Sequence, residues 1–152
     1  NFEQKHVIPR KVVERFGEDL TGKTFAIWGL AFKPDTDDMR QAAAITIINE
    51  LTKRGAKVKA YDPKAEKEAR VCYLKDNKNV EYCDSKYTVL VDADAMILVT
   101  EWKEFRQPDF IEIKKRLKNP VIFDGRNQFD AHSLSDKGFE YYQIGVSSKL
   151  NK

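Results

Sequence analysis

The chain has 152 residues, of which 41% are hydrophobic and 34% charged, and its formal net charge is +3. This length and composition are typical of one globular domain. Lysine and arginine are scattered and form no basic block interleaved with aromatic residues, which argues against a nucleic-acid partner. No apolar run is long enough to span a bilayer and nothing resembles a signal peptide, so we expect a cytoplasmic protein without a membrane partner.

The first predicted element is a helix over residues 1–16. Its apolar positions Val7, Ile8, Val12, Val13 and Phe16 have helical spacing, and Gly17 follows them directly. The chain opens on Asn rather than Met, and a helix that starts this abruptly suggests a piece of a longer protein. We therefore interpret residues 1–20 as the end of a helix that links this domain to another one.

From residue 21 onward, apolar strands alternate with amphipathic helices. The patterns predict strands at 23–29, 56–62, 79–83, 94–100, 120–125 and 139–145, and helices at 40–55, 64–74, 85–93, 108–119 and 131–138. Such alternation predicts an α/β fold, a Rossmann-like three-layer sandwich with a mostly parallel sheet. Ligands of such sheets bind at the carboxyl ends of the strands, where we expect the loop after Trp28, Asp62, the segment TEWKEF (100–105) and the segment DGRN (124–127).

The loop after the first strand, GLAFKPDTDDMRQ (29–41), occupies the place of a phosphate-binding loop but contains one glycine. The motif G-x-G-x-x-G is absent, so a dinucleotide held by this loop is disfavoured. Asp62 ends the second strand, where a Rossmann domain keeps its ribose-binding acid. Because Pro63 follows, we interpret Asp62 as a turn or helix-cap residue instead.

The three aspartates of this loop allow two interpretations. Asp35, Asp37 and Asp38 could gather oxygen ligands for magnesium, as in a phosphoryl-transfer enzyme. Asp37 and Asp38 also precede a predicted helix, where carboxylates cap free N–H groups. We favour capping and expect no metal site.

Cationic side chains offer a third possibility. Lys33 and Arg40 lie in this loop, Arg126 follows another strand at the same sheet edge, and Phe32 adds a flat apolar surface. Together they could hold a diphosphate. On spacing alone, pairing of these cations with the loop aspartates is an equally good explanation.

Nucleophilic catalysis finds no support. Cys72 and Cys83 have no CxxC partner or neighbouring histidine, and His6 and His132 accompany no serine or cysteine motif. We expect no catalytic residue within this chain.

Four segments in order, IWGLAFKPDTDDMR, AYDPKA, VTEWKEF and VIFDGRN, together resemble the carboxy-terminal UDP-binding domain of the UDP-glucose/GDP-mannose dehydrogenase family. The resemblance covers nearly the whole chain and is greatest to UDP-glucose 6-dehydrogenases. It implies that residues 21–152 bind UDP-glucose or UDP-glucuronate in an enzyme that oxidises the sugar with two NAD. NAD would be bound mainly by a separate amino-terminal domain, the nucleophilic cysteine would lie outside this chain, and a central region would form a homodimer.

The resemblance also assigns residues. It implies substrate contacts by Phe32, Lys33 and Arg126, and a cofactor contact by Arg40. The family usually continues Arg-Glu-Ser/Ala-Pro where this chain has Arg40 followed by Gln41, Ala42 and Ala43, a departure that concerns the cofactor side. The fragment alone is expected to be inactive. Alternatives are a stand-alone nucleotide-sensing module and a dehydrogenase of another nucleotide sugar.

Overall fold

A computed structural model describes residues 2–145, and side chains from residue 5 onward. Its centre is one six-stranded sheet with the order β3-β2-β1-β4-β5-β6, in which every neighbouring pair is parallel. The strands are β1 (Thr24–Trp28), β2 (Lys57–Tyr61), β3 (Val80–Tyr82), β4 (Ala95–Leu98), β5 (Val121–Asp124) and β6 (Glu140–Gln143). Every residue of β4 and β5 is buried, as expected for strands covered on both faces.

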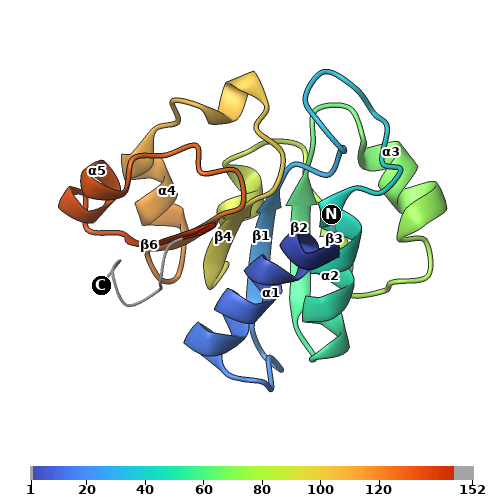
Figure 1. Ribbon diagram of the computed structural model, residues 1–152, viewed down its shortest axis with the longest axis horizontal. Coiled ribbons are helices and arrows are strands. Elements are labelled where there is room, and N and C mark those ends of the chain that lie inside the picture. The colour runs from blue at the N-terminus through green and yellow to red at the C-terminus, as the bar shows by residue number, and fades with distance from the viewer. Residues whose placement is uncertain (1, 146–152) are drawn as a thin grey trace.

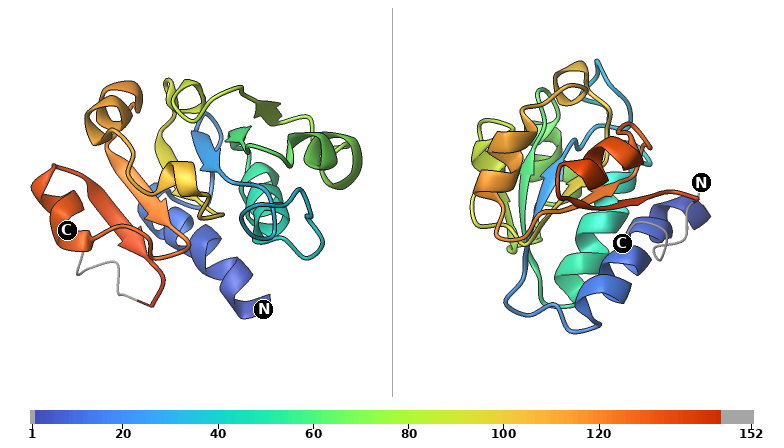
Figure 2. Two further views of the ribbon diagram at one scale, coloured as in Figure 1. Left: turned by 90° about the horizontal axis from the view of Figure 1, so that it is seen from above. Right: turned by 90° about the vertical axis from the view of Figure 1, so that its left-hand side faces the viewer.

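Helices complete the three layers. α1 (Phe2–Phe16) and α2 (Ala43–Lys53) lie side by side on one face of the sheet, and α4 (Phe110–Arg116) lies on the other (Figures 1 and 2). Shorter elements are α3 (Glu66–Glu68), its π-helical continuation η1 (Ala69–Tyr73), the 3₁₀ turns η2 (Thr88–Leu90) and η3 (Lys103–Phe105), and α5 (Ala131–Asp136). The predicted α/β three-layer sandwich is confirmed.

All five helices predicted after residue 21 are shorter than their patterns suggest, and three of them also differ in their start or helix type. The helix predicted at 40–55 begins at Ala43, because Gln41 has a φ of 59° that a right-handed helix does not allow. Its N-cap is Ala42, so the prediction that Asp37 and Asp38 cap this helix is wrong. The segment predicted at 85–93 forms only the turn η2, because Val91 is extended and Asp92 has a φ of 61° that a right-handed helix does not allow. The segment predicted at 64–74 is divided between α3 and η1.

The first helix packs against the domain. Ile8 and Val12 of α1 are fully buried, and Gly17 ends the helix with φ 99° while its N–H donates to the Val13 carbonyl. α1 runs toward the start of β1, so its first turns lie near the carboxyl ends of the strands (Figure 1). The division of the chain at residues 20 and 21 stays a prediction.

Candidate functional site

A cleft of about 390 Å³ opens at the carboxyl edge of the sheet, within the size range of small-molecule sites. The loops after β1, β4 and β5 form most of it, and α1 and α2 close its sides. The residues that line it include Phe32, Gln41, Val99, Arg126, Asn127 and Ile144. It therefore lies where the strand order reverses between β1 and β4, the usual ligand position in such sheets.

Phe32 and Arg126 are the two predicted substrate residues that the cleft brings together. Phe32 is 54% exposed although it is large and apolar, so its ring is available to a ligand. The Arg126 side chain is half-exposed, and its Nε and Nη2 donate to one oxygen of Glu101 at 3.1 and 2.9 Å. Because one carboxylate oxygen takes both donors, the remaining N–H groups of the guanidinium are available to an anion.

Lys33 and Arg40 do not line the cleft. Arg40 is strongly exposed and pairs with Asp38, whose oxygens lie 2.9–3.2 Å from its Nε and Nη2. These hydrogen bonds lower the pKa of the Asp38 carboxyl to about 2, and the nearby Lys33 charge contributes to the same shift. Pairing of cations with the loop aspartates, one of the two explanations open from spacing, is thus confirmed for Arg40 and Asp38. Arg126 pairs with Glu101 and not with a loop aspartate.

Asp62 holds the loop that carries Phe32. Its Oδ2 accepts from the backbone N–H groups of Leu30 and Ala31 at 2.6 and 2.9 Å and from Trp102 Nε1 at 3.1 Å. Its Oδ1 accepts from the N–H groups of Lys64 and Ala65 at 2.8 and 2.7 Å. The side chain is 5% exposed, so its hydrogen-bonding capacity is used internally. The interpretation of Asp62 as a turn residue is confirmed.

This arrangement bears on the cofactor. With a single glycine in the first loop and Asp62 bonded to the loop itself, the residues of this sheet edge do not fit the binding of a dinucleotide in the usual Rossmann manner. Gly29 has φ 100°, and a Cβ there would lie 2.5 Å from Thr100 Cβ. The glycine thus serves close packing of β1 against the segment after β4.

The residues of the TEW motif each fix a different segment. Thr100 Oγ1 donates to the Ala31 carbonyl at 2.6 Å, Glu101 binds Arg126, and Trp102 donates to Asp62. Three consecutive residues after β4 thereby connect the loops after β1, β2 and β5. The motif positions the cleft walls.

Asp124 holds the loop after β5, which forms part of the cleft wall. The side chain is fully buried, and it accepts from the N–H groups of Arg126, Gln128 and Phe129 and from the Tyr141 hydroxyl, over 2.6–2.9 Å. Burial, with the Asp124 hydrogen bond as a second cause, raises the pKa of Tyr141. The backbone of Arg126 is therefore held at a fixed place beside the cleft.

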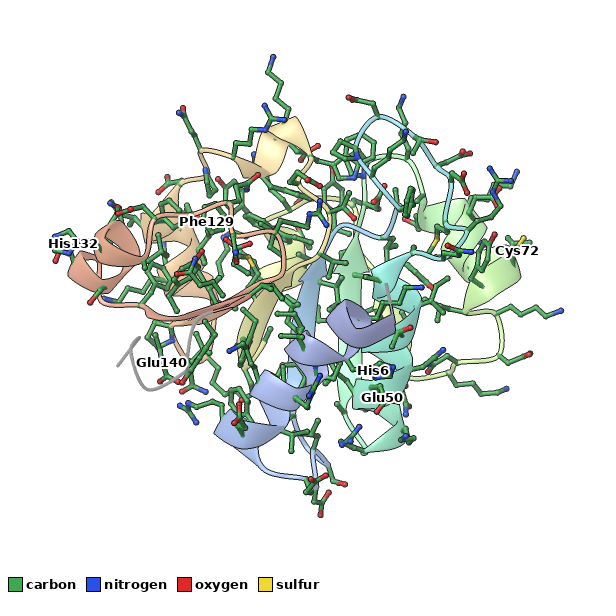
Figure 3. All side chains as sticks on the ribbon, in the orientation of Figure 1. His6, Glu50, Cys72, Phe129, His132 and Glu140 are labelled. Carbon is green, nitrogen blue, oxygen red and sulfur yellow. The ribbon has the colours of Figure 1, made fainter. Side chains whose placement is uncertain are left out.

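Other candidate residues lie apart. Asp35 and Asp37 border a separate hollow with Thr36 and Lys64, and the described residues contain no group of three or more His, Cys, Asp or Glu side chains suited to a metal ion. Cys72 and His132 lie at opposite ends of the molecule, and His6 lies on α1 (Figure 3). No helix within residues 2–145 has the length and apolar character needed to cross a membrane.

A second hollow, of about 760 Å³, lies beside α4. It is lined by Phe110, Ile111 and Phe139 together with Lys114, Lys115 and Lys137. Ile111 is 79% exposed. None of the predicted site residues lies there.

Sequence reasoning missed several residues of the first cleft. Lys5, Ile8 and Ile144 come from the two ends of the described chain, and only the fold brings them to this edge. Asn127 has φ 52°, and its side-chain amide donates to the carbonyl of Ile144 and accepts from its N–H. Asn127 belongs to the motif FDGRN, which drew attention to this loop, but no motif in the sequence marks its partner Ile144 after β6.

An all-parallel sheet in this order, with a ligand-sized cleft at its switch point, defines a Rossmann-like domain of the class that binds nucleotides. Residues 26–131 match the sequence model of the UDP-glucose/GDP-mannose dehydrogenase family, UDP binding domain. The chain belongs to this family.

Individual relatives agree with the match. A UDP-glucose 6-dehydrogenase of Pseudomonas aeruginosa is 39% identical over 147 residues, which are 95% of this chain and 32% of the relative. A UDP-glucose dehydrogenase structure from Pyrobaculum islandicum has a TM-score of 0.75 at 27% sequence identity. The match covers 94% of this chain and 29% of the Pyrobaculum chain. An NDP-N-acetyl-D-galactosaminuronic acid dehydrogenase structure from Methanosarcina mazei has a TM-score of 0.76 at 27% sequence identity. This match covers 99% of this chain and 30% of the Methanosarcina chain. The chain thus spans about a third of the length of these relatives.

Proposed function

We propose that this chain is the UDP-sugar-binding domain of a longer NAD-dependent UDP-glucose 6-dehydrogenase, which converts UDP-glucose to UDP-glucuronate. The observation that carries the proposal is the cleft at the carboxyl edge, which both Phe32 and Arg126 line, in a chain that matches the family's UDP-binding domain. The family match favours this function over a stand-alone sensing module. The family match also favours the proposed function over magnesium-dependent phosphoryl transfer. That reaction would use Asp38 as a metal ligand, but Asp38 is paired with Arg40.

In this proposal the cleft binds the part of the substrate that does not react. Arg126 neutralises charge on the diphosphate, and the ring of Phe32 contacts the nucleotide sugar. Lys33 remains a proposed substrate contact, although it does not line the cleft. The charge of the diphosphate does not change when the sugar is oxidised, so these contacts stabilise substrate and transition state alike. They place the sugar for chemistry carried out by residues outside this chain.

Cofactor and assembly belong to the rest of the proposed enzyme. NAD is held mainly by another domain, and Arg40 offers it a cation from an exposed position. Its Asp38 partner must then release the guanidinium or share it. The proposal includes a homodimer formed through a central region, a cytoplasmic location and an inactive isolated domain.

Calorimetric titration of residues 1–152 with UDP tests the proposal. We expect binding without magnesium, and a loss of affinity of about tenfold or more for Arg126→Ala, because charge-assisted hydrogen bonds to phosphate are lost. Arg106→Ala is the matched control, since Arg106 is exposed on the segment after β4 and does not line the cleft. Absence of UDP binding at millimolar concentration, or a strict requirement for magnesium, would contradict the proposal.

The sugar itself has a second candidate. The Methanosarcina mazei relative is named for an N-acetylated sugar and has the same fold at a similar TM-score. Competition of UDP-glucose and UDP-N-acetylgalactosamine for the full-length enzyme, measured as kcat/KM, separates the two. A higher value for the N-acetylated sugar would replace UDP-glucose while leaving the UDP site in place.

A further inference from the structure

The cleft has a wall that lies outside the part of the chain matched by the family's sequence model. Lys5 and Ile8 of α1 line it, whereas the match begins at residue 26. Ile8 packs against the loop after β5, since its Cγ1 lies 3.6 Å from the position of a Cβ added to Gly125. The first turns of this helix are therefore in contact with the loop that carries Arg126.

Lys5 lines the cleft from the first turns of α1. Residues three and four apart lie on the same face of a helix, so Lys5 shares a face with Ile8 and lies one turn closer to the amino end. Ile8 is 2% exposed, while Lys5 is half-buried. Lys5 thus lies one helical turn beyond the buried Ile8, at the carboxyl edge of the sheet where the cleft opens.

The charged side chains that line the described part of the cleft are of one sign. Among its described lining residues the charged ones are Lys5 and Arg126, and both are cations. Glu101 pairs with Arg126 but does not line the cleft. Lys5 makes no ion pair with any residue whose side chain is described, so its charge is not neutralised within that part of the chain. A cleft with two cations and no carboxylate among these residues favours an anionic ligand.

We propose that Lys5 is an anion-binding residue of this cleft and acts with Arg126 on the phosphates of the bound nucleotide. The proposal rests on the proposed function and extends it. Arg126 supplies forked hydrogen bonds from the loop after β5, and Lys5 supplies a compact charge from α1, which packs against that loop. The helix at the start of the chain then belongs to the binding site as well as to the connection between domains.

The test compares UDP with uridine, which lacks phosphates, on residues 1–152. We expect Lys5→Gln to weaken UDP binding about fivefold to tenfold and to leave uridine binding unchanged, because only the phosphate contact is lost. The salt dependence of UDP binding should also decrease, since one fewer cation contributes. Lys5→Arg should retain most of the affinity.

Lys57→Gln is the matched control. It removes the same charge from an exposed residue at the first position of β2, on the opposite edge of the sheet, and it should bind UDP like the unchanged chain. Wild-type affinity for UDP in Lys5→Gln, alongside a loss in Arg126→Ala, would overturn the role of Lys5 and leave the proposed function standing. Equal loss of UDP and uridine would also overturn it, because the effect would then be structural. Failure of the unchanged chain to bind UDP would overturn both proposals.

Discussion

Replacing Asp62 with asparagine separates its structural role from nucleotide binding. Asparagine has the same shape but one acceptor oxygen, and its NH₂ group is a donor. With the oxygen turned toward Leu30, Ala31 and Trp102, the NH₂ faces the N–H groups of Lys64 and Ala65. Two backbone donors lose their acceptor, at a cost of about 1–3 kcal/mol each.

We expect a total loss of about 3 kcal/mol in the free energy of unfolding, because the N–H of Ala65 is buried and that of Lys64 only partly so. Urea denaturation measures it: with a slope of about 2 kcal/mol per molar, the midpoint falls by about 1.5 M. Asp92→Asn is the control, an exposed site with φ 61° that asparagine tolerates. There we expect a change within about 0.5 kcal/mol.

The alternative role of Asp62 gives a different result. If its carboxylate served to bind a ribose, Asp62→Asn would leave the urea midpoint unchanged and abolish nucleotide binding. A loss of stability below about 1 kcal/mol would refute the view that this side chain is the acceptor for five internal donors.

Two further predictions follow from local geometry. Gly29→Ala should lower the free energy of unfolding by about 3 kcal/mol or more in the same urea assay. Residue 29 has φ 100°, and the added Cβ would lie 2.6 Å from the backbone nitrogen of Thr100. Gly17→Ala is the control: residue 17 has φ 99° but no atom within 4 Å of the added Cβ, so the loss should be only about 1–2 kcal/mol. Equal losses would show that close packing at Gly29 is unimportant. The Asp38 carboxyl should titrate by NMR near pH 2, and in Arg40→Gln its pKa should rise but stay below the ordinary value of about 4, because the backbone N–H of residue 40 still donates to it. Since its folded pKa is depressed, the ion pair contributes above about pH 4 and is lost as the pH falls toward 2; a wild-type midpoint near 4 would contradict the pairing.

The sequence predicted the fold well because strand and helix periods alternate clearly and turn residues mark their ends. Asp109 is an example: it lies at the start of the helix predicted at 108–119, and its side chain accepts the N–H groups of Ile111 and Glu112. The late start of α2 was missed because glutamine rarely takes positive φ, so residue type gave no warning at Gln41.

The candidate site was predictable where motifs follow strands. Phe32 and Arg126 share the cleft, as their strand-end positions suggested. The partner of Arg126 was not predictable, because Glu101 is separated from it by 25 residues and is brought close by the pairing of β4 with β5. Lys5 lacked any signal for the same reason, since only the packing of α1 brings it to the cleft.

The most direct test of the central claim is to map backbone amide shifts of residues 1–152 by NMR as UDP is added. The account predicts that the largest shifts cluster around the cleft, at residues 5–8, 31–41 and 125–127. Shifts confined to the hollow beside α4, at Phe110, Ile111 and Phe139, would contradict it. So would shifts that require magnesium and center on Asp35 and Asp37.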